Sequence, residues 1–125
     1  MMKEVQKETV MMGRLPHGSD LLTQLTDVCR NRDIRLGRIS AVGAVQQACI
    51  SYYNQRSKEY EQNTIKEPME ISSLIGNVSL HDGRPVVHAH VNLAREDGTV
   101  LGGHLEEGTE VFAAEVMIEQ YSGAE

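Results

Sequence analysis

The chain has 125 residues, of which 40% are apolar and 24% charged, and its formal net charge at pH 7 is −6. This length fits a single domain, expected over residues 1–125, and is enough to bury a core. With one Phe and no Trp, aliphatic side chains must fill that core. The acidic balance disfavours nonspecific nucleic-acid binding, because phosphate contacts need clustered Lys and Arg.

The two cysteines, Cys29 and Cys49, lie far apart and form no CxxC pair. This spacing indicates neither a disulfide framework nor a thiolate zinc site, so both are expected to be small core residues. No apolar run in the sequence reaches the roughly 18 residues of a membrane span. Residues 1–15 lack the apolar stretch of a signal peptide. We therefore expect a cytoplasmic protein with no membrane partner.

The first predicted element is a strand around TVMMGRL, residues 9–15. One main helix should follow, over about residues 19–32, with Ser19 or Asp20 as its N-cap. Its apolar side chains recur at helical spacing, at Leu21, Leu22, Leu25, Val28 and Cys29.

The rest of the chain is predicted to form short strands separated by turns. The expected strands are IRLGRISAVGAV, ACISYYN, MEISSLIGNVSL, PVVHAHVNLA, TVLGGHL and TEVFAAEVMIEQY, with QRSKEYEQ as a polar hairpin tip after the second. In the last strand, the period of a half-buried antiparallel strand places on one face Phe112, Ala114, Val116 and Ile118, and on the other Glu115 and Glu119. The predicted fold class is therefore α+β, with a largely antiparallel sheet.

Three of the five histidines fall within residues 88–104. His88 and His90 share a face if this segment is a strand, because side chains two residues apart point the same way, roughly 6.5 to 7 Å apart. A two-residue turn before His104 would put it on the other face, whereas a three-residue loop over residues 96–98 puts it opposite His90. Gly98 lies where the three-residue loop needs a left-handed residue.

If the preceding loop, His81-Asp82-Gly83, also has three residues, Gly76 lies opposite His88. Gly102 and Gly103 weaken the strand just before His104 and could let it bulge. The register of these two strands is therefore left open: His104 lies either on the same face as His88 and His90 or on the other face.

Three neutral imidazoles with an open fourth position are typical of a zinc site that retains water or a small ligand. HxH alone is a weak motif, and three scattered strand histidines are the alternative. His17, before the helix, and His81, in a turn, are not expected to be ligands.

Three carboxylates, Glu106, Glu107 and Glu115, could accept a hydrogen bond from an imidazole N–H or act as base for a metal-bound water; each could equally be solvated. A polar-aromatic hairpin could contact a partner or be solvated, and it contains Tyr52, Tyr53, Tyr60, Arg56 and Lys58.

The chain resembles the PPC domain, the plant and prokaryote conserved domain found alone in bacteria and archaea and behind AT-hooks in plants. The resemblance covers roughly residues 13–121 and rests on GRLPHGSDLL, GRISAVGAVQQACISYYN, EISSLIGNVSLHDGRPVVHAHVNL and DGTVLGGHLEEGTEVFAAEVMI. It implies a mixed fold with a largely antiparallel sheet, assembled as a homotrimer. It also implies that His88, His90 and His104 hold a metal ion, zinc or another divalent metal.

Members of this family are commonly labelled DNA-binding, but the plant proteins contact DNA through a separate AT-hook that enters the minor groove. The sequence contains no such basic Arg-Gly-Arg-Pro segment, and the fragment at residues 83–85 lies in an expected turn. One departure is Glu106, where similar sequences more often have an apolar residue.

Three functions remain open. The first is a trimeric three-His metal-binding module that binds a small-molecule ligand or has a regulatory role, the second a DNA-binding regulator, and the third a zinc-dependent hydrolase with Glu106 or Glu107 as base. The sequence shows no Ser-His-Asp arrangement, P-loop or dinucleotide motif. We favour the first function and leave open whether the protein is an enzyme.

Overall fold

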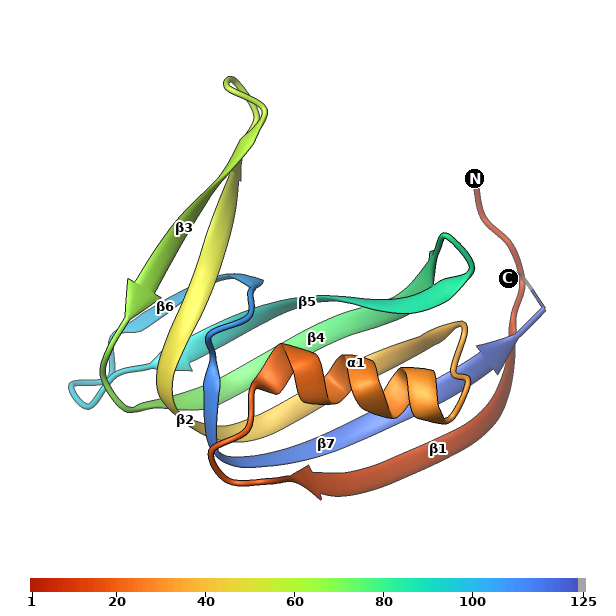
Figure 1. Ribbon diagram of the computed structural model, residues 1–125, viewed down its shortest axis with the longest axis horizontal. Coiled ribbons are helices and arrows are strands. Elements are labelled where there is room, and N and C mark those ends of the chain that lie inside the picture. Colours follow the sequence, from red (N-terminus) through yellow and green to blue (C-terminus); the bar gives the residue numbers. More distant parts are fainter. Residues whose placement is uncertain (124–125) are drawn as a thin grey trace.

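The computed structural model describes residues 1–123, which form one helix packed on one face of a seven-stranded antiparallel sheet (Figure 1). The elements are β1 (Gln6–Leu15), α1 (Leu21–Asn31), β2 (Gly37–Asn54), β3 (Glu59–Ile65), β4 (Met69–His81), β5 (Arg84–Ala94), β6 (Val100–Leu105) and β7 (Glu110–Ser122). The strand order is β1-β7-β2-β4-β5-β6, with β3 paired to β2. The expected class, an antiparallel sheet with one main helix, is confirmed.

α1 begins where the sequence places its N-cap, with Asp20 as the capping residue. One carboxylate oxygen of Asp20 accepts the backbone N–H of Thr23 at 2.9 Å, and the other accepts that of Gly108 at 2.7 Å. The predicted apolar stripe faces the sheet, and Leu21, Leu25 and Cys29 are fully buried. α1 has 11 residues, fewer than the roughly 17 that a membrane-spanning helix needs, and the described residues form no other helix.

Replacing Asp20 with Ala should lower the free energy of unfolding by about 1–2 kcal/mol, because the cap of α1 and the anchor of the Gly108 turn are lost together. Asp20→Asn keeps one acceptor oxygen and should lose less. Urea denaturation of both variants measures the difference. Equal stability of wild type and Asp20→Ala would show that the capping contacts contribute nothing.

Both cysteines are buried, as the sequence predicts. Burial raises the pKa of the Cys29 thiol to about 11, so this group is protonated and unreactive at neutral pH. Cys29 belongs to the core between α1 and the sheet, together with aliphatic side chains of the strands such as Ile39, Leu74, Val91 and Val111. The aliphatic core expected from composition is confirmed.

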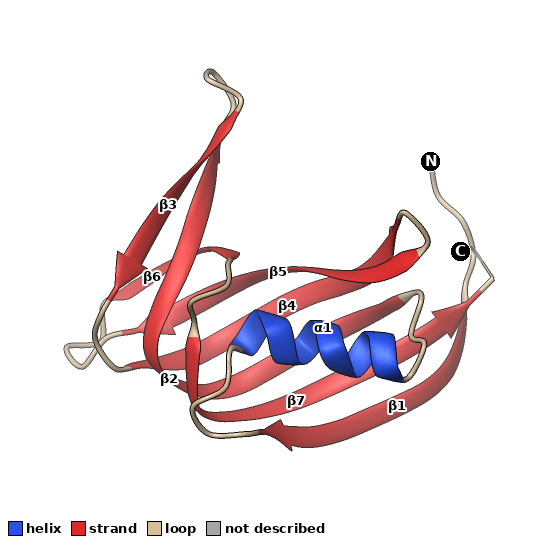
Figure 2. Cartoon of the chain, in the orientation of Figure 1, coloured by secondary structure: helices blue, strands red, loops and turns tan. Residues whose placement is uncertain are grey.

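β2 is a single strand of 18 residues, although the sequence predicted two. Its first part pairs with β4 and β7, and its last part pairs with β3 and β6 (Figure 2). Ser51 of β2 lies opposite His104 of β6. The two strands can approach because Gly103 has no side chain: a Cβ there would lie 2.7 Å from the carbonyl oxygen of Ser51.

Two parts of the sheet differ from the sequence prediction. Phe112 does not lie on the buried face of β7 but is 56% exposed, while Val111 is buried. A register irregularity between β2 and β7 at this point shifts the alternation, and only Ala114, Val116 and Ile118 keep the predicted face. β3 was not predicted as a strand, because six of its seven residues are exposed and no alternation reveals it.

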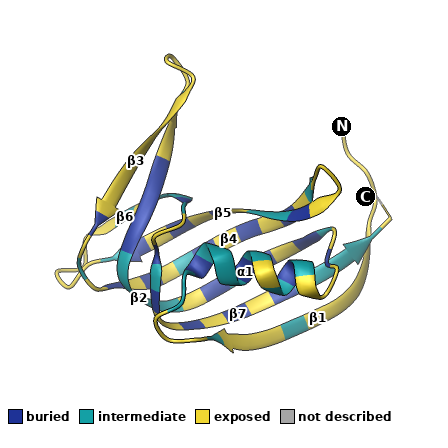
Figure 3. Cartoon of the chain, in the orientation of Figure 1, coloured by how far each residue is buried: buried dark blue, intermediate teal, exposed yellow. Residues whose placement is uncertain are grey.

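The sheet has one face under α1 and one open face (Figure 3). In β5 the core face carries Ala89, Val91 and Leu93, all buried, whereas His88 and His90 are exposed on the open face. The histidines therefore lie on the side of the sheet opposite the helix.

Candidate metal centre

The turn between β5 and β6 sets the position of His104. It is the three-residue loop over residues 96–98, with Gly98 in the left-handed region at φ +87°. The backbone N–H of Arg95 donates to the carbonyl of Thr99 at 2.8 Å, which closes the loop. In the resulting register His104 lies directly opposite His90, as predicted from the loop length, and no bulge interrupts the ladder from Val100 to His104.

The turn between β4 and β5 is shorter than predicted. Asp82 and Gly83 both have positive φ, 51° and 76°, which is the two-residue type I′ turn that Asp-Gly favours. This shifts the register by one residue, so His88 lies opposite Asn77. The prediction that Gly76 faces His88 is therefore wrong, and an amide side chain stands next to the imidazole instead.

The three imidazoles of His88, His90 and His104 converge. One ligand nitrogen from each lies within 4.8 Å of the others, and the ring centroids are 4.9 to 5.7 Å apart. Nitrogens that share a tetrahedral zinc ion at about 2.0–2.1 Å would be about 3.4 Å apart, so small ring rotations would bring the donors to coordination distance. The donor set fits zinc or another imidazole-binding divalent ion.

His104 is the least exposed of the three histidines. Partial burial lowers its pKa, Glu106 opposes this effect, and the two neighbouring histidines add to it. The net shift favours the neutral imidazole, which is the form that binds metal. The ring of Tyr60, from β3, lies 5.3 Å from the ring of His104 and covers it on the hairpin side.

Glu106 is the one predicted carboxylate that the fold brings to the cluster. Its Oε1 lies 3.7 Å from Nε2 of His104, and its Oε2 accepts a hydrogen bond from the Gln62 amide at 3.2 Å. The amide holds the carboxylate beside the imidazole. Glu106 is thus positioned to orient His104 or to interact with a ligand at the cluster.

The other predicted candidates lie elsewhere. Glu107 lines a groove next to α1, and Glu115, on β7, pairs with Arg14 at 3.9 Å. His17 donates from Nδ1 to the carbonyl of Phe112 at 2.9 Å, and His81 is exposed in its turn beside Asp82. Neither histidine joins the cluster, as predicted.

Two features of the site escaped sequence reasoning. Ser51 is 4% exposed, and its hydroxyl has no hydrogen-bond partner among residues 1–123, although it lies opposite His104. A cavity of about 520 Å³ also opens beside the histidines, and its lining includes Arg38, Ile75, Asn77, His88, His90 and Tyr121. The Asp-Gly turn signal could have placed Asn77, but the contacts of Ser51 and Arg38 depend on strand order.

Two curated relatives, each called Bifunctional protein GlmU, come from two Synechococcus strains and are 33% and 32% identical to this chain over 107 residues. The match covers 84% of this chain but 16% of each relative. The chain therefore spans about a sixth of their length, and the likeness concerns one part of a longer protein.

Solved structures match over nearly the whole chain. A plant- and prokaryote-conserved (PPC) protein of Pyrococcus horikoshii is 38% identical with a TM-score of 0.95, covering 100% of this chain and 87% of that one. A protein of Archaeoglobus fulgidus described as metal-containing is 44% identical with a TM-score of 0.91, covering 98% and 87%. A Bacteroides thetaiotaomicron protein named as a candidate for DNA binding is 27% identical with a TM-score of 0.87, covering 95% and 85%.

The model of the Plants and Prokaryotes Conserved (PCC) domain matches residues 2–122. This range takes in every strand, the helix and all three clustered histidines. The chain therefore belongs to the Plants and Prokaryotes Conserved domain family.

Proposed function

We propose that His88, His90 and His104 bind one divalent metal ion, zinc in the first instance, and that the protein is a metal-dependent ligand-binding or regulatory module. The observation that carries this proposal is the shared face: two strands bring three imidazole nitrogens within 4.8 Å of one another. Three imidazoles that converge on one face match the nitrogen ligands that zinc and similar divalent ions prefer. The 44% identical relative that is called metal-containing supports the proposal.

An ion held by three imidazoles keeps at least one position for another ligand and acts there as a Lewis acid. The chain's own residues define what surrounds that position. Glu106 places a carboxylate beside His104, the Tyr60 ring closes one side, and Ser51 offers a buried hydroxyl with no hydrogen-bond partner among the described residues. On the other side lies the open cavity, which is large enough for a small molecule.

The metal content of the purified protein tests this proposal. Wild type is expected to carry about one zinc or other divalent ion per chain by plasma mass spectrometry, and His88→Ala and His90→Ala less than about a tenth of that, because two imidazoles bind far more weakly than three. His81→Ala removes an exposed histidine outside the cluster and should keep the ion. Equal metal content in all four proteins would contradict the assignment of these ligands.

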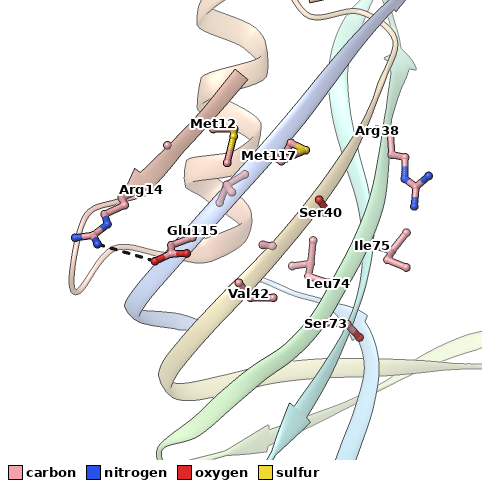
Figure 4. A pocket seen from close by; sticks show the side chains of 13 residues that line it. Met12, Arg14, Arg38, Ser40, Val42, Ser73, Leu74, Ile75, Glu115 and Met117 are labelled. Carbon is pink, nitrogen blue, oxygen red and sulfur yellow. Dashed lines mark ion pairs between the residues drawn. The ribbon is translucent and has the colours of Figure 1, made fainter. Parts of the chain in front are cut away.

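We further propose that the chain forms a homotrimer through the open face of the sheet. Beyond the histidine cavity, that face carries exposed large apolar side chains, which include Met12 at 77%, Val42 at 51% and Met117 at 36% exposure. They surround a shallow cavity of about 560 Å³ (Figure 4). Apolar surface of this kind on one face is typical of an interaction site, and the family resemblance favours copies of the same chain as the occupant.

DNA binding is less well supported for this chain than for the neighbours that carry the name. The net charge is −6. Of the arginines on the open face, Arg14 forms an ion pair with Glu115. A phosphate-binding surface needs several clustered cations. The names of related proteins therefore do not outweigh the charge of this one.

A further inference from the structure

We propose that Arg38 is the anion-recognising residue of the histidine site, and that the cavity between them binds a small molecule carrying a carboxylate or phosphate group. This inference rests on the proposed metal function, since the ion would take one oxygen of the ligand and Arg38 the others. It adds the chemical class of the ligand and a residue, Arg38, that is not a metal ligand.

Cross-strand pairing places Arg38 in the same row across the sheet as His88. Across the sheet, Arg38 of β2 pairs with Asn77 of β4, and Asn77 pairs with His88 of β5. The side chains of these three residues share the open face, and Arg38 and His88 are two strand spacings apart, or roughly 9–10 Å. Both line the cavity of about 520 Å³, together with Asn77 and His90. A small ligand can therefore reach the arginine and the imidazoles at once.

The Arg38 side chain forms no salt bridge with the described residues. Its cross-strand neighbour on the other side is Glu119 of β7, yet that carboxylate is engaged by Lys7 at 3.3 Å and by the Tyr121 hydroxyl at 2.5 Å. These two contacts, and more weakly the charge of Arg38, lower the pKa of Glu119. Among residues 1–123, the guanidinium of Arg38 forms no hydrogen bond or ion pair, although its charge acts on the nearby Glu119 and Tyr121.

The contrast with Arg14 supports this assignment. Arg14 is also on the open face, but it forms an ion pair with Glu115. Arg38 lies with Ile75 on the opposite side of the shallow cavity (Figure 4). An unpaired guanidinium presents a planar fork of donors that matches the two oxygens of a carboxylate or phosphate. In a chain of net charge −6, a local cation next to a metal site selects anions against the overall field.

The lining also limits the ligand. Ile75, opposite His90, adds an apolar side chain to the lining, and the Asn77 side chain contributes an amide beside His88. An amide can donate to an anion or accept from a hydroxyl of the same molecule. These groups suit a compact molecule with one or two acidic groups rather than a polymer.

Cobalt-loaded protein titrated with oxalate, inorganic phosphate or the neutral isostere oxamide tests the inference, with the visible absorption of the ion as readout. Oxalate or phosphate is expected to change the wild-type spectrum saturably, and oxamide to leave it unchanged. Arg38→Ala should weaken the binding of the anion at least about tenfold, as expected for the loss of a charge-assisted bidentate contact, and Arg38→Lys should weaken it less. Arg14→Ala is the matched control and should bind like wild type.

Cobalt binding and anion binding are measured separately. All arginine variants should bind cobalt with wild-type affinity, which also shows that they are folded. If wild type binds no cobalt, the proposed metal function fails, and the inference with it. If cobalt binds normally but Arg38→Ala takes up oxalate and phosphate as tightly as wild type, or if oxamide binds equally well, the assignment of Arg38 is overturned while the metal site stands.

Discussion

Zinc at a free concentration one hundred times its dissociation constant should raise the free energy of unfolding of the wild-type protein by about 2.7 kcal/mol. For a domain of this size that corresponds to an increase in Tm of about 10 °C. The same zinc concentration should leave the Tm of His104→Ala nearly unchanged, because this variant keeps only the two imidazoles of β5. Differential scanning calorimetry with zinc and with a chelator measures both shifts.

His104 is the sharpest position for this experiment because it joins the site from a different strand. Its loss removes the cross-strand ligand while His88 and His90 keep their positions on β5. His81→Ala should respond to zinc like wild type, since His81 is exposed outside the cluster. An equal zinc-induced shift in wild type and His104→Ala would mean that the ion stabilises the protein from another site.

Light scattering coupled to size-exclusion chromatography is expected to give wild type a mass of three times the 13.9 kDa chain. Met12→Lys combined with Val42→Lys should reduce it to that of a single chain. These substitutions put two cations into the centre of the proposed interface, where they would be desolvated and repel the copies in the neighbouring protomers. Both side chains are exposed in the single chain, so the fold should tolerate the change.

Val100→Lys is the matched control for this pair. Val100 is 58% exposed, close to the 51% of Val42, but lies on β6 next to the β5–β6 loop and does not line the cavity between Met12 and Val42. It should leave the mass at three chains. A wild-type mass of one chain, or a double variant that still has the mass of three, would contradict assembly through this face.

The sequence predicted that His88, His90 and His104 could share one face because the element that decides this is local. The three-residue loop closed by Gly98 places His104 opposite His90 because the strand after it runs without a bulge, and turn chemistry of this kind can be read from a few residues. The same reasoning failed one turn earlier, where Asp82 itself adopts positive φ and shortens the loop. An Asp-Gly pair is compatible with a two-residue turn and with a three-residue turn. The pairing of β4 with β5 decides between them.

Other parts of the fold could not be predicted because they depend on partners distant in sequence. The exposure of Phe112 follows from an irregularity in the pairing of β7 with β2. Likewise, the alignment of Arg38 with Asn77 and His88 requires β4 to lie between β2 and β5. Local periodicity shows which residues share a face of a strand, but it does not show which strands are neighbours.

Anomalous diffraction measured at the zinc absorption edge, from crystals of the zinc-loaded protein, tests the central claim most directly. We expect one strong peak per chain on the open face of the sheet, about 2.0–2.1 Å from one nitrogen each of His88, His90 and His104. A difference peak from a further ligand should lie toward Arg38. A map with no peak between the three imidazoles, or with the zinc bound only by other residues, would contradict the account.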